Sequence, residues 1–414
     1  MNYSVRLREL LLGGVCYFAF QLASATQFQI SDPVEFSKII DTNTAVLTTN
    51  ATLALSEGSL VLEGPTWIPG NPGYLIFSYF NNSNPGDSNG RLKKLVLPGA
   101  VTDYLVPPAG TVYNGSTLDL QERFISCQAG SAGLCVAMIT NNNVVTKMVT
   151  ACNGLKFYSP NDVVTKSDGT IWFTDPGFNS GITFGTSGYA TGHNVYRFNP
   201  TNGNATCAAV LTFPETGNSS EPNGLCFSPD ESLLYLADWG NRRILVYSVS
   251  PSNTLSGGST FMTLPNGKGN PDGIRCDAAG RVYSSASDGV YIYRPYPDGR
   301  LIGQIVTPTG VNNLCFGGAD RCTLFIASAP NILSVPLKVT GAVWIRKLCV
   351  QANRSSFTVS WPAPSTGFEL EASDSLGAQA VWIEVASSPQ VTNGLNQVSQ
   401  TASNSAKFFR LHLD

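Results

Sequence analysis

The chain has little histidine and little charge. Its 414 residues include two histidines, His193 and His412, and charged residues make up only 13%. A serine–histidine–aspartate hydrolase needs a histidine beside its nucleophile, and the Gly-x-Ser-x-Gly elbow is also absent. No HExxH, GxxxxGK[ST], GxGxxG or CxxC pair occurs, which argues against zinc held by His or Cys and against the common nucleotide sites. The net charge of −3 argues against a nucleic-acid partner.

Long apolar runs are also absent. Residues 1–25 contain Arg6 and Arg8, an apolar stretch over residues 10–20, and the small-x-small sequence of residues 23–25. This pattern is typical of a cleaved export signal. The apolar stretch is shorter than the about 20 residues that cross a bilayer. We therefore predict an exported protein, periplasmic or extracellular, without a membrane span.

Export would permit disulfides, but cysteine spacing alone does not show any. Cys226 and Cys276 lie in apolar strand patterns, which favours buried thiols. Two other pairs remain possible, Cys127 with Cys135 and Cys315 with Cys322. N-x-S/T sequons stand at Asn50, Asn81, Asn114, Asn204, Asn218 and Asn353.

Glycine and proline are plentiful, with 40 and 25 residues, which favours short strands and many turns. Between residues 45 and 340, an Asn- or Asp-bearing turn followed by two short strands returns about every 45 residues, six times in all. An array of β-sandwiches would give no reason for polar residues to recur where strands begin. We predict an all-β chain with a six-bladed β-propeller over residues 26–342.

The composition changes near residue 342. Alternating strand patterns without the long period fill the remaining residues, for example Phe357-Thr358-Val359-Ser360-Trp361. We predict a small C-terminal β-sandwich over residues 343–414, similar to fibronectin- or Ig-like modules. Its expected role is accessory, such as binding a surface or a polysaccharide.

Four motifs at long intervals offer oxygen ligands. They are Glu63-Gly64-Pro65-Thr66-Trp67, Ser159-Pro160-Asn161-Asp162, Pro222-Asn223-Gly224 and Pro271-Asp272-Gly273. We interpret them as turns, three of which lead directly into strand-like runs. Taken alone, Asn161, Asn223 and Asp272 are compatible with ordinary turn residues, since Asn and Asp favour turns. Glu63 is less easily explained in this way, because Glu is not a turn former. Two carboxylates and two amides together are ligands that suit a hard divalent cation.

The order and spacing of these motifs resemble the SMP-30/gluconolactonase/LRE family of six-bladed propellers. The resemblance also covers Ser167-Asp168-Gly169-Thr170-Ile171-Trp172-Phe173-Thr174-Asp175-Pro176 and Phe316-Gly317-Gly318-Ala319-Asp320. It implies one metal at the centre of the propeller, with ligands carried over to Glu63, Asn161, Asn223 and Asp272. It also implies that Asp272 is the general base.

The implied activity is the opening of a sugar lactone by a gluconolactonase-like enzyme. Ca²⁺ is the expected cation, with Zn²⁺, Mn²⁺ and Mg²⁺ as alternatives. Four protein ligands leave positions open, so a lactone carbonyl could be polarised while Asp272 takes the proton of the attacking water. The expected partner is a small lactone or ester, and the expected state is a monomer.

Two stretches depart from the family pattern. Gln128-Ala129 stands where relatives carry Glu-His, and Lys156-Phe157-Tyr158 stands where they carry Arg-x-Asn. The predicted substrate contacts are Asn114, Lys156, Tyr158 and Gln128. Asp162 is expected to cap a turn or face solvent, and His193 to be a surface residue.

The departures leave two other functions open. The same metal site could act on another lactone, an aryl ester or an organophosphate, which an apolar pocket near Phe157 and Tyr158 would favour. Alternatively, the propeller could bind a sugar or a protein without catalysis, with a purely structural metal. The loss of Glu-His at residues 128–129 is the main support for that reading.

Overall fold

A computed structural model describes residues 27–413 apart from 55–58, 71, 82–89, 131–132, 141, 179–185, 215–219, 343–347, 353–354, 363–367, 378, 393–394 and 402–406. The predicted export signal lies outside the described residues. The described chain is all-β, with one short α-helix, α1 (Pro33–Ile39), and two 3-10 turns, η1 (Gly203–Thr206) and η2 (Trp239–Asn241). None of its helices has the length and apolar content that a membrane crossing requires.

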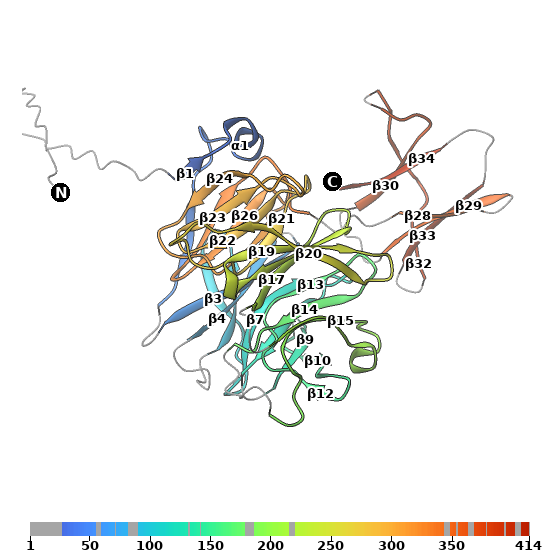
Figure 1. The fold of residues 1–414 in the computed structure, drawn as a ribbon. Coiled ribbons are helices and arrows are strands. Elements are labelled where there is room, and N and C mark those ends of the chain that lie inside the picture. The colour runs from blue at the N-terminus through green and yellow to red at the C-terminus, as the bar shows by residue number, and fades with distance from the viewer. Residues whose placement is uncertain are drawn as a thin grey trace, which may run out of the picture.

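Six antiparallel sheets follow one another through the described part of the first 336 residues (Figure 1). The first three sheets are β3 (Leu60–Ile68), β4 (Tyr74–Asn81), β5 (Arg91–Val96) and β6 (Ala100–Leu105); β7 (Val112–Leu118), β8 (Phe124–Ala129), β9 (Cys135–Ile139) and β10 (Val145–Val149); and β13 (Val163–Thr165), β14 (Ile171–Asp175), β15 (His193–Phe198) and β16 (Ala208–Phe213). A hairpin of β11 (Ala151–Cys152) and β12 (Leu155–Lys156) precedes the third sheet.

The other three sheets use the same meander, and two of them gain an N-terminal strand. They are β17 (Pro222–Phe227), β18 (Leu233–Asp238), β19 (Arg243–Val249) and β20 (Leu255–Thr263); β21 (Ile274–Cys276), β22 (Val282–Ala286), β23 (Gly289–Tyr293) and β24 (Leu301–Val306) with β1 (Phe28–Ile30); and β25 (Asn313–Gly317), β26 (Thr323–Ser328) and β27 (Asn331–Pro336) with β2 (Thr48–Thr52).

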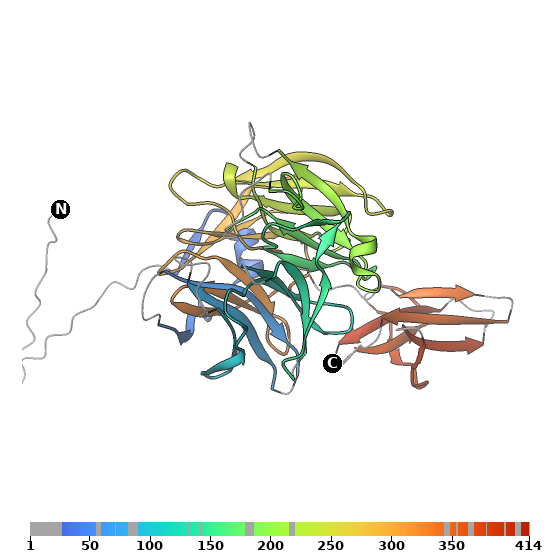
Figure 2. The ribbon, with the colours of Figure 1, turned by 90° about the horizontal axis from the view of Figure 1, so that it is seen from below.

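The first strands of these sheets form a ring. Strand β3 contacts β7, β7 contacts β13, and the contacts continue through β17, β21 and β25 back to β3. The sheets are distributed around a common centre, which Figure 2 shows from a second direction. The arrangement is propeller-like, and the first strand of each sheet is the innermost.

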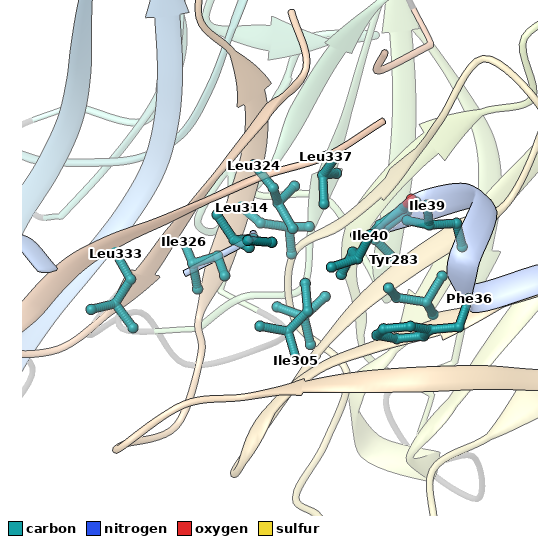
Figure 3. Close-up of a cluster of buried hydrophobic side chains, with 14 of the residues drawn as sticks. Phe36, Ile39, Ile40, Tyr283, Ile305, Leu314, Leu324, Ile326, Leu333 and Leu337 are labelled. Atoms are coloured by element: carbon teal, nitrogen blue, oxygen red, sulfur yellow. The ribbon is translucent and has the colours of Figure 1, made fainter. Parts of the chain in front are cut away.

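Apolar and polar residues alternate along the strands, and the apolar ones form the core between neighbouring sheets. The largest cluster of buried apolar residues lies between the fifth and sixth sheets and includes Ile305, Leu314 and Leu324 (Figure 3). Phe36 and Ile39 of helix α1 cover one side of that cluster. Burial of apolar surface between the sheets is the main stabilising force for this arrangement.

The strands that follow residue 342 form two further sheets. They are β28 (Cys349–Ala352), β29 (Ser356–Pro362), β33 (Leu395–Thr401) and β32 (Gln390–Thr392), and then β31 (Ile383–Glu384), β30 (Phe368–Ser373) and β34 (Phe408–Leu413). Val359, Trp361 and Val398 from the first sheet pack against Leu370 of the second. Figures 1 and 2 show these strands as a separate group.

The eight described cysteines whose side chains are placed are all free thiols. The possible pairs Cys127 with Cys135 and Cys315 with Cys322 are therefore not disulfides in this structure. Cys226 and Cys276 are buried, as their strand patterns predict, and their sulfur atoms lie 3.8 Å apart.

Candidate functional site

The four predicted cation ligands lie at the centre of the ring, each on a different sheet. Glu63 is part of β3 and Asn223 is part of β17, while Asn161 and Asp272 each stand two residues before β13 and β21. Glu63, Asn161 and Asn223 are 4%, 7% and 3% exposed, and Asp272 is half-buried. The ring therefore collects oxygen-bearing side chains from residues more than two hundred positions apart in the sequence.

Two of the four motifs are not turns, which corrects the sequence interpretation. Residues 63–67 lie inside β3 and residues 222–224 inside β17. The register of each strand shifts at this point, between Glu63 and Thr66 and between Pro222 and Leu225. Such β-bulges re-aim a side chain without ending the strand, so Pro and Gly serve the bulge here.

Glycines behind the site residues let the inner strands approach closely. A Cβ on Gly224 would lie 2.1 Å from the carbonyl oxygen of Asp272, and one on Gly64 would lie 2.3 Å from that of Asn114. Gly64 also has a φ of +50°, which favours glycine. A larger residue at either position would push neighbouring sheets apart.

Glu63 is held in place by neutral donors. Its Oε2 atom accepts hydrogen bonds from Gly64 N–H at 2.9 Å and from Asn313 Nδ2 at 2.8 Å. Burial, and secondarily the carboxylate of Asp162, raise the pKa of Glu63 to about 7. A positive charge at this place would stabilise the ionised carboxylate.

Asp272 has a similar environment. Burial and the nearby carboxylates of Glu63 and Asp162 raise the pKa of its carboxyl group well above the usual range, against a hydrogen bond from the Asn223 amide. Its backbone N–H donates to Ser285 Oγ at 2.8 Å, and its carbonyl accepts from Gly224 N–H at 3.2 Å. The side chain is therefore on a rigid backbone and remains partly accessible.

The two amides differ in their surroundings. The backbone of Asn161 is bound on both sides, because its N–H donates to Thr174 O at 2.8 Å and its carbonyl accepts from Gly115 N–H at 2.7 Å. Asn223 Oδ1 is buried, and within the described part of the chain it has no hydrogen-bond partner. An unpaired buried oxygen is unfavourable, whereas a bound cation would satisfy it.

Three neighbouring residues were not predicted as part of the site. Asp162 was expected to cap a turn or face solvent. Its carboxylate accepts a hydrogen bond from Val163 N–H at 3.0 Å. However, the residue is only 1% exposed, and its carboxylate pairs with Arg275 Nη1 at 3.3 Å. Asn313 binds Glu63. Arg275 sits in an alternating strand pattern that carries no signal of a buried cation, whereas Asp162 directly follows Asn161 in a recognised motif.

The ionisable groups around the centre carry an excess of negative charge, which suits a divalent cation. The carboxylates of Glu63, Asp162 and Asp272 act on one another, and the Arg275 guanidinium opposes the charges of Glu63 and Asp162. With all groups ionised, two negative charges remain. No group of three or more His, Cys, Asp or Glu side chains in the described residues is placed to hold a metal by itself. A cation at the centre would need the amide oxygens as well.

The predicted substrate contacts have different environments. Asn114 is half-buried beside the inner strands, and its carbonyl accepts from Ser78 Oγ at 2.9 Å. Lys156 is exposed, with Nζ 5.6 Å from the ring of Tyr189, which stacks at 5.6 Å on Tyr158. Tyr158 is fully buried. The structure thus joins Lys156 and Tyr158 through one aromatic ring.

Gln128 and His193 are both buried. The Gln128 amide donates to Gly133 O at 2.7 Å and accepts from the Cys135 thiol at 3.6 Å. Both the nitrogen and the oxygen of the amide therefore bind residues of the same sheet and its connecting loop. His193 was expected at the surface, but it begins β15, is 7% exposed and has Nδ1 2.7 Å from Pro176 O. Strand pairing buries it, which the flanking glycines did not indicate.

Fold and site together describe an all-β, propeller-like protein with carboxylates and amides at the centre of its ring. The chain belongs to the SMP-30/gluconolactonase/LRE-like family, whose profile matches residues 62–330. A gluconolactonase of Zymomonas mobilis is 29% identical over 304 residues, which are 67% of this chain and 79% of that protein. A lactonohydrolase of Aspergillus oryzae is 27% identical over 197 residues, 42% of each chain.

Solved structures agree with this assignment. A gluconolactonase of Xanthomonas campestris has 27% identity and a TM-score of 0.62, and the match covers 76% of this chain and 96% of that chain. Regucalcin of Agrobacterium tumefaciens, a calcium-binding protein, has 19% identity and a TM-score of 0.51, covering 69% of this chain and 92% of its own. The second likeness concerns the fold alone.

Proposed function

We propose that this protein is a lactonase that opens a sugar lactone to the hydroxy acid with the help of one divalent cation. Its relatives support sugar lactones as the substrate class, since they include the Zymomonas gluconolactonase and a 6-deoxy-6-sulfogluconolactonase of Pseudomonas putida that is 33% identical over 115 residues, or 27% of this chain and 40% of that relative. Glucono-δ-lactone is the test substrate that follows from them.

The proposed architecture is a six-bladed β-propeller over residues 26–342 with a β-sandwich over residues 343–414. The ring of six inner strands supports the first part, and the shared cluster around Trp361 supports the second. We also propose export through residues 1–25, action as a monomer, and a surface- or polysaccharide-binding role for the C-terminal module.

Glu63, Asn161, Asn223 and Asp272 would hold the cation. The single observation that carries this assignment is the buried Asn223 Oδ1, which lacks a hydrogen-bond partner among the described residues and lies beside Asp272. The excess of two negative charges agrees with it. Oxygen donors of this kind suit Ca²⁺ first, with Mg²⁺, Mn²⁺ or Zn²⁺ as alternatives.

When bound, the cation would polarise the lactone carbonyl. Asp272 is the proposed general base, because it alone of the four ligands is partly exposed and can reach a water molecule next to the substrate. Ser285 and Gly224 fix the Asp272 backbone, so its carboxylate points to a defined place. Lys156 and Asn114 are proposed to orient the substrate.

The test is hydrolysis of D-glucono-δ-lactone by the mature chain, followed with a pH indicator after EDTA treatment and after Ca²⁺ is added back. We expect Ca²⁺ to restore turnover and Asp272→Asn to lower it by about a hundred- to ten-thousand-fold. Asp230→Asn is the matched control, because Asp230 is an exposed turn carboxylate that bonds Ser228 and Ser232. A folded protein that hydrolyses no lactone with any of the four metals would contradict the proposal and favour another ester or a binding role.

A further inference from the structure

The carboxylate of Asp162 connects three sheets. It accepts hydrogen bonds from Val163 N–H at 3.0 Å in its own sheet and from the backbone N–H of Leu225 in β17. It also accepts from Arg275 Nη1 of β21 at 3.3 Å. One buried carboxylate thus accepts hydrogen bonds from the inner strands of three consecutive sheets of the ring. These hydrogen bonds are charge-assisted and therefore strong.

Each of these contacts is adjacent to a proposed cation ligand. Val163 follows Asn161 by two residues, Leu225 follows Asn223 by two, and Arg275 follows Asp272 by three. A shift of the Asp162 carboxylate would therefore move three of the four ligands relative to one another.

Both members of the pair are themselves fixed. The Asp162 N–H donates to Thr174 Oγ1 at 3.1 Å, and its carbonyl accepts from Thr174 N–H at 3.0 Å. Arg275 Nη1 also donates to its own neighbour, Ile274 O, at 2.7 Å. The pair cannot swing away without breaking these bonds.

Charge gives the pair a second role. Asp162 is close enough to Glu63 and Asp272 to raise the pKa of both, so the site holds three mutually repelling carboxylates. Arg275 faces Asp162 and also acts on Glu63. Arg275 binds the Asp162 carboxylate. The carboxylates of Glu63 and Asp272 and the two ligand amides therefore remain available for the cation.

We propose that Asp162 and Arg275 are positioning residues that hold Asn161, Asn223 and Asp272 in the arrangement a divalent cation needs. This inference rests on the proposed function of the same site. Groups that support metal ligands in this way typically change metal affinity by about ten- to a hundred-fold when they are removed.

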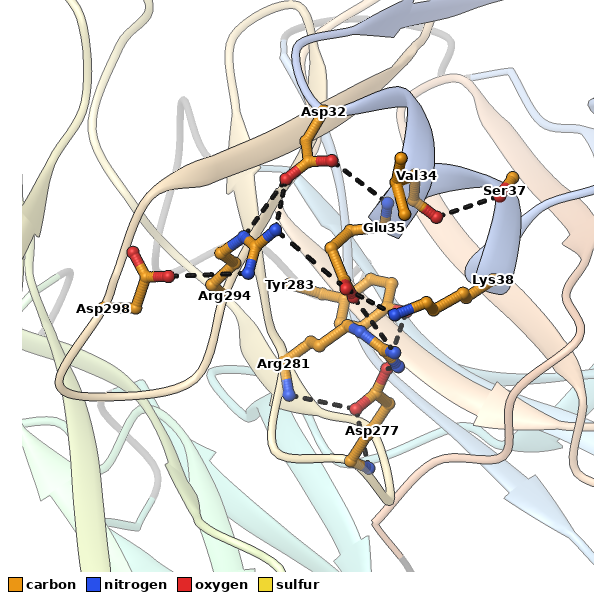
Figure 4. A network of polar contacts seen from close by, with 11 residues as sticks. Asp32, Val34, Glu35, Ser37, Lys38, Asp277, Arg281, Tyr283, Arg294 and Asp298 are labelled. Carbon is orange, nitrogen blue, oxygen red and sulfur yellow. Dashed lines mark hydrogen bonds and ion pairs between the residues drawn. The ribbon is translucent and has the colours of Figure 1, made fainter.

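A buried ion pair could also contribute only to folding, and the chain offers a matched control for that role. Asp277 and Arg281 form a second buried pair at 2.9 Å, at the other end of β21 from Asp272 (Figure 4). Asp277 also accepts from Tyr283 Oη at 3.2 Å, and Arg281 faces Glu35 of helix α1 at 3.5 Å. Breaking this pair perturbs the same sheet away from the site.

The experiment is calorimetric titration of the metal-free full-length mature protein with Ca²⁺, together with melting temperature. The test variants are Arg275→Met and the double variant Asp162→Asn/Arg275→Met, which leaves no unpaired buried charge if the single change prevents folding. The control is Asp277→Asn/Arg281→Met. We expect about ten- to a hundred-fold weaker Ca²⁺ binding in the test variants and wild-type affinity in the control, with lower melting temperatures in both. Arg275→Lys, which keeps the charge but not the planar fork, should restore part of the affinity.

The outcomes separate the two proposals. Wild-type protein that binds none of the four divalent cations would overturn the proposed metal site and this inference with it. Wild-type binding with unchanged Ca²⁺ affinity in the folded Asp162→Asn/Arg275→Met variant would overturn the inference alone. An equal loss of affinity in the control would also overturn it, because the effect would then be general destabilisation.

Discussion

At the scale of single residues, side chains at the end of the second strand of a sheet hold the backbone that precedes a site residue. Asp175, at the end of β14, accepts from Tyr158 N–H at 2.9 Å and from Ser159 N–H at 2.5 Å, just before Asn161. Asp238, at the end of β18, accepts from Glu221 N–H at 3.1 Å, two residues before Asn223. The same arrangement thus occurs in the third and fourth sheets, each of which presents one amide side chain, Asn161 or Asn223, to the centre.

Asp175 allows a prediction about pH. Burial raises its pKa from 3.8 to about 6, against the backbone hydrogen bonds from Ser159 and Tyr158. Because the folded-state pKa lies above the unfolded value, the proton on Asp175 stabilises the fold fully below pH 3.8, and this stabilisation is lost as the pH rises through about 6. From well below pH 3.8 to well above pH 6, the wild type should lose about 3 kcal/mol of unfolding free energy relative to Asp175→Asn. Urea unfolding of both proteins across this range measures the difference, and parallel pH profiles would contradict the prediction.

Gly224 gives a prediction about close approach. Gly224→Ala places a Cβ 2.1 Å from the backbone oxygen of Asp272, so β17 and β21 must separate. We expect a loss of about 1–3 kcal/mol in unfolding free energy, together with weaker Ca²⁺ binding, because Asn223 lies on β17 and Asp272 stands two residues before β21. Gly310→Ala is the control, since its Cβ would meet nothing nearer than 3.5 Å. Equal melting temperatures of the two variants would show that the strands tolerate the change.

At the scale of elements, the N-terminal segment completes the last two sheets. Strand β1 pairs with β24, β2 pairs with β27, and helix α1 lies between them. Asp32 caps the N-terminus of the helix, since its side chain accepts from Glu35 N–H at 3.1 Å, and it also pairs with Arg294 (Figure 4). Segments from both ends of the ring therefore share two sheets, which joins the sheets into one cooperative unit.

Phe36 tests how much this segment contributes. Its side chain is 1% exposed and packs in the cluster of Figure 3, where its ring lies against Gly303. Phe36→Ala should lower the free energy of unfolding by about 3–5 kcal/mol while leaving the Ca²⁺ affinity of the folded protein unchanged. Val34→Ala on the exposed face of the same helix, where Val34 is 68% exposed, should change stability by less than about 0.5 kcal/mol. Chemical denaturation measures both, and a small effect of Phe36→Ala would mean that the helix docks only loosely.

At the scale of the whole molecule, the ring and the C-terminal strands have separate cores. The backbone up to Ala342 still belongs to the ring, because Ala342 N–H donates to Cys276 O at 2.9 Å. The cluster of Val359, Trp361, Leu370 and Val398 lies entirely beyond that point. Separate cores normally fold separately.

A shortened protein that ends at Ala342 should therefore keep its function. We expect wild-type kcat/KM on glucono-δ-lactone and an unchanged Ca²⁺ affinity, because no proposed ligand or substrate residue lies after Asp272. Steady-state kinetics and titration calorimetry on the purified fragment check this. Loss of soluble protein or of activity would show that the ring depends on the C-terminal strands.

Sequence patterns predicted much of the fold but only part of the site. Alternating apolar residues and regular turns predicted strands in the six sheets of the ring and in the C-terminal sheets, but not the β11–β12 hairpin. The motif order placed Glu63 and Asp272 among the candidates. The sequence pattern predicts turns where β3 and β17 have bulges, because Pro and Gly are common in both turns and bulges. Alternation shows which face of β21 carries Arg275 but not what lies across from it.

The sequence by itself determined which chemical groups are available at the centre, namely carboxylates and amides in a fixed order along the chain, and it also determined family membership. The tertiary structure decided which of them are buried, paired or left without a partner. Asp162 and Arg275 are 113 residues apart, and they meet only because the closed ring brings the inner ends of its third and fifth sheets together. Desolvation and charge interactions depend on all the sheets that surround a group. The raised pKa of Glu63 and the Asn223 oxygen, which has no hydrogen-bond partner among the described residues, therefore follow from the closed ring.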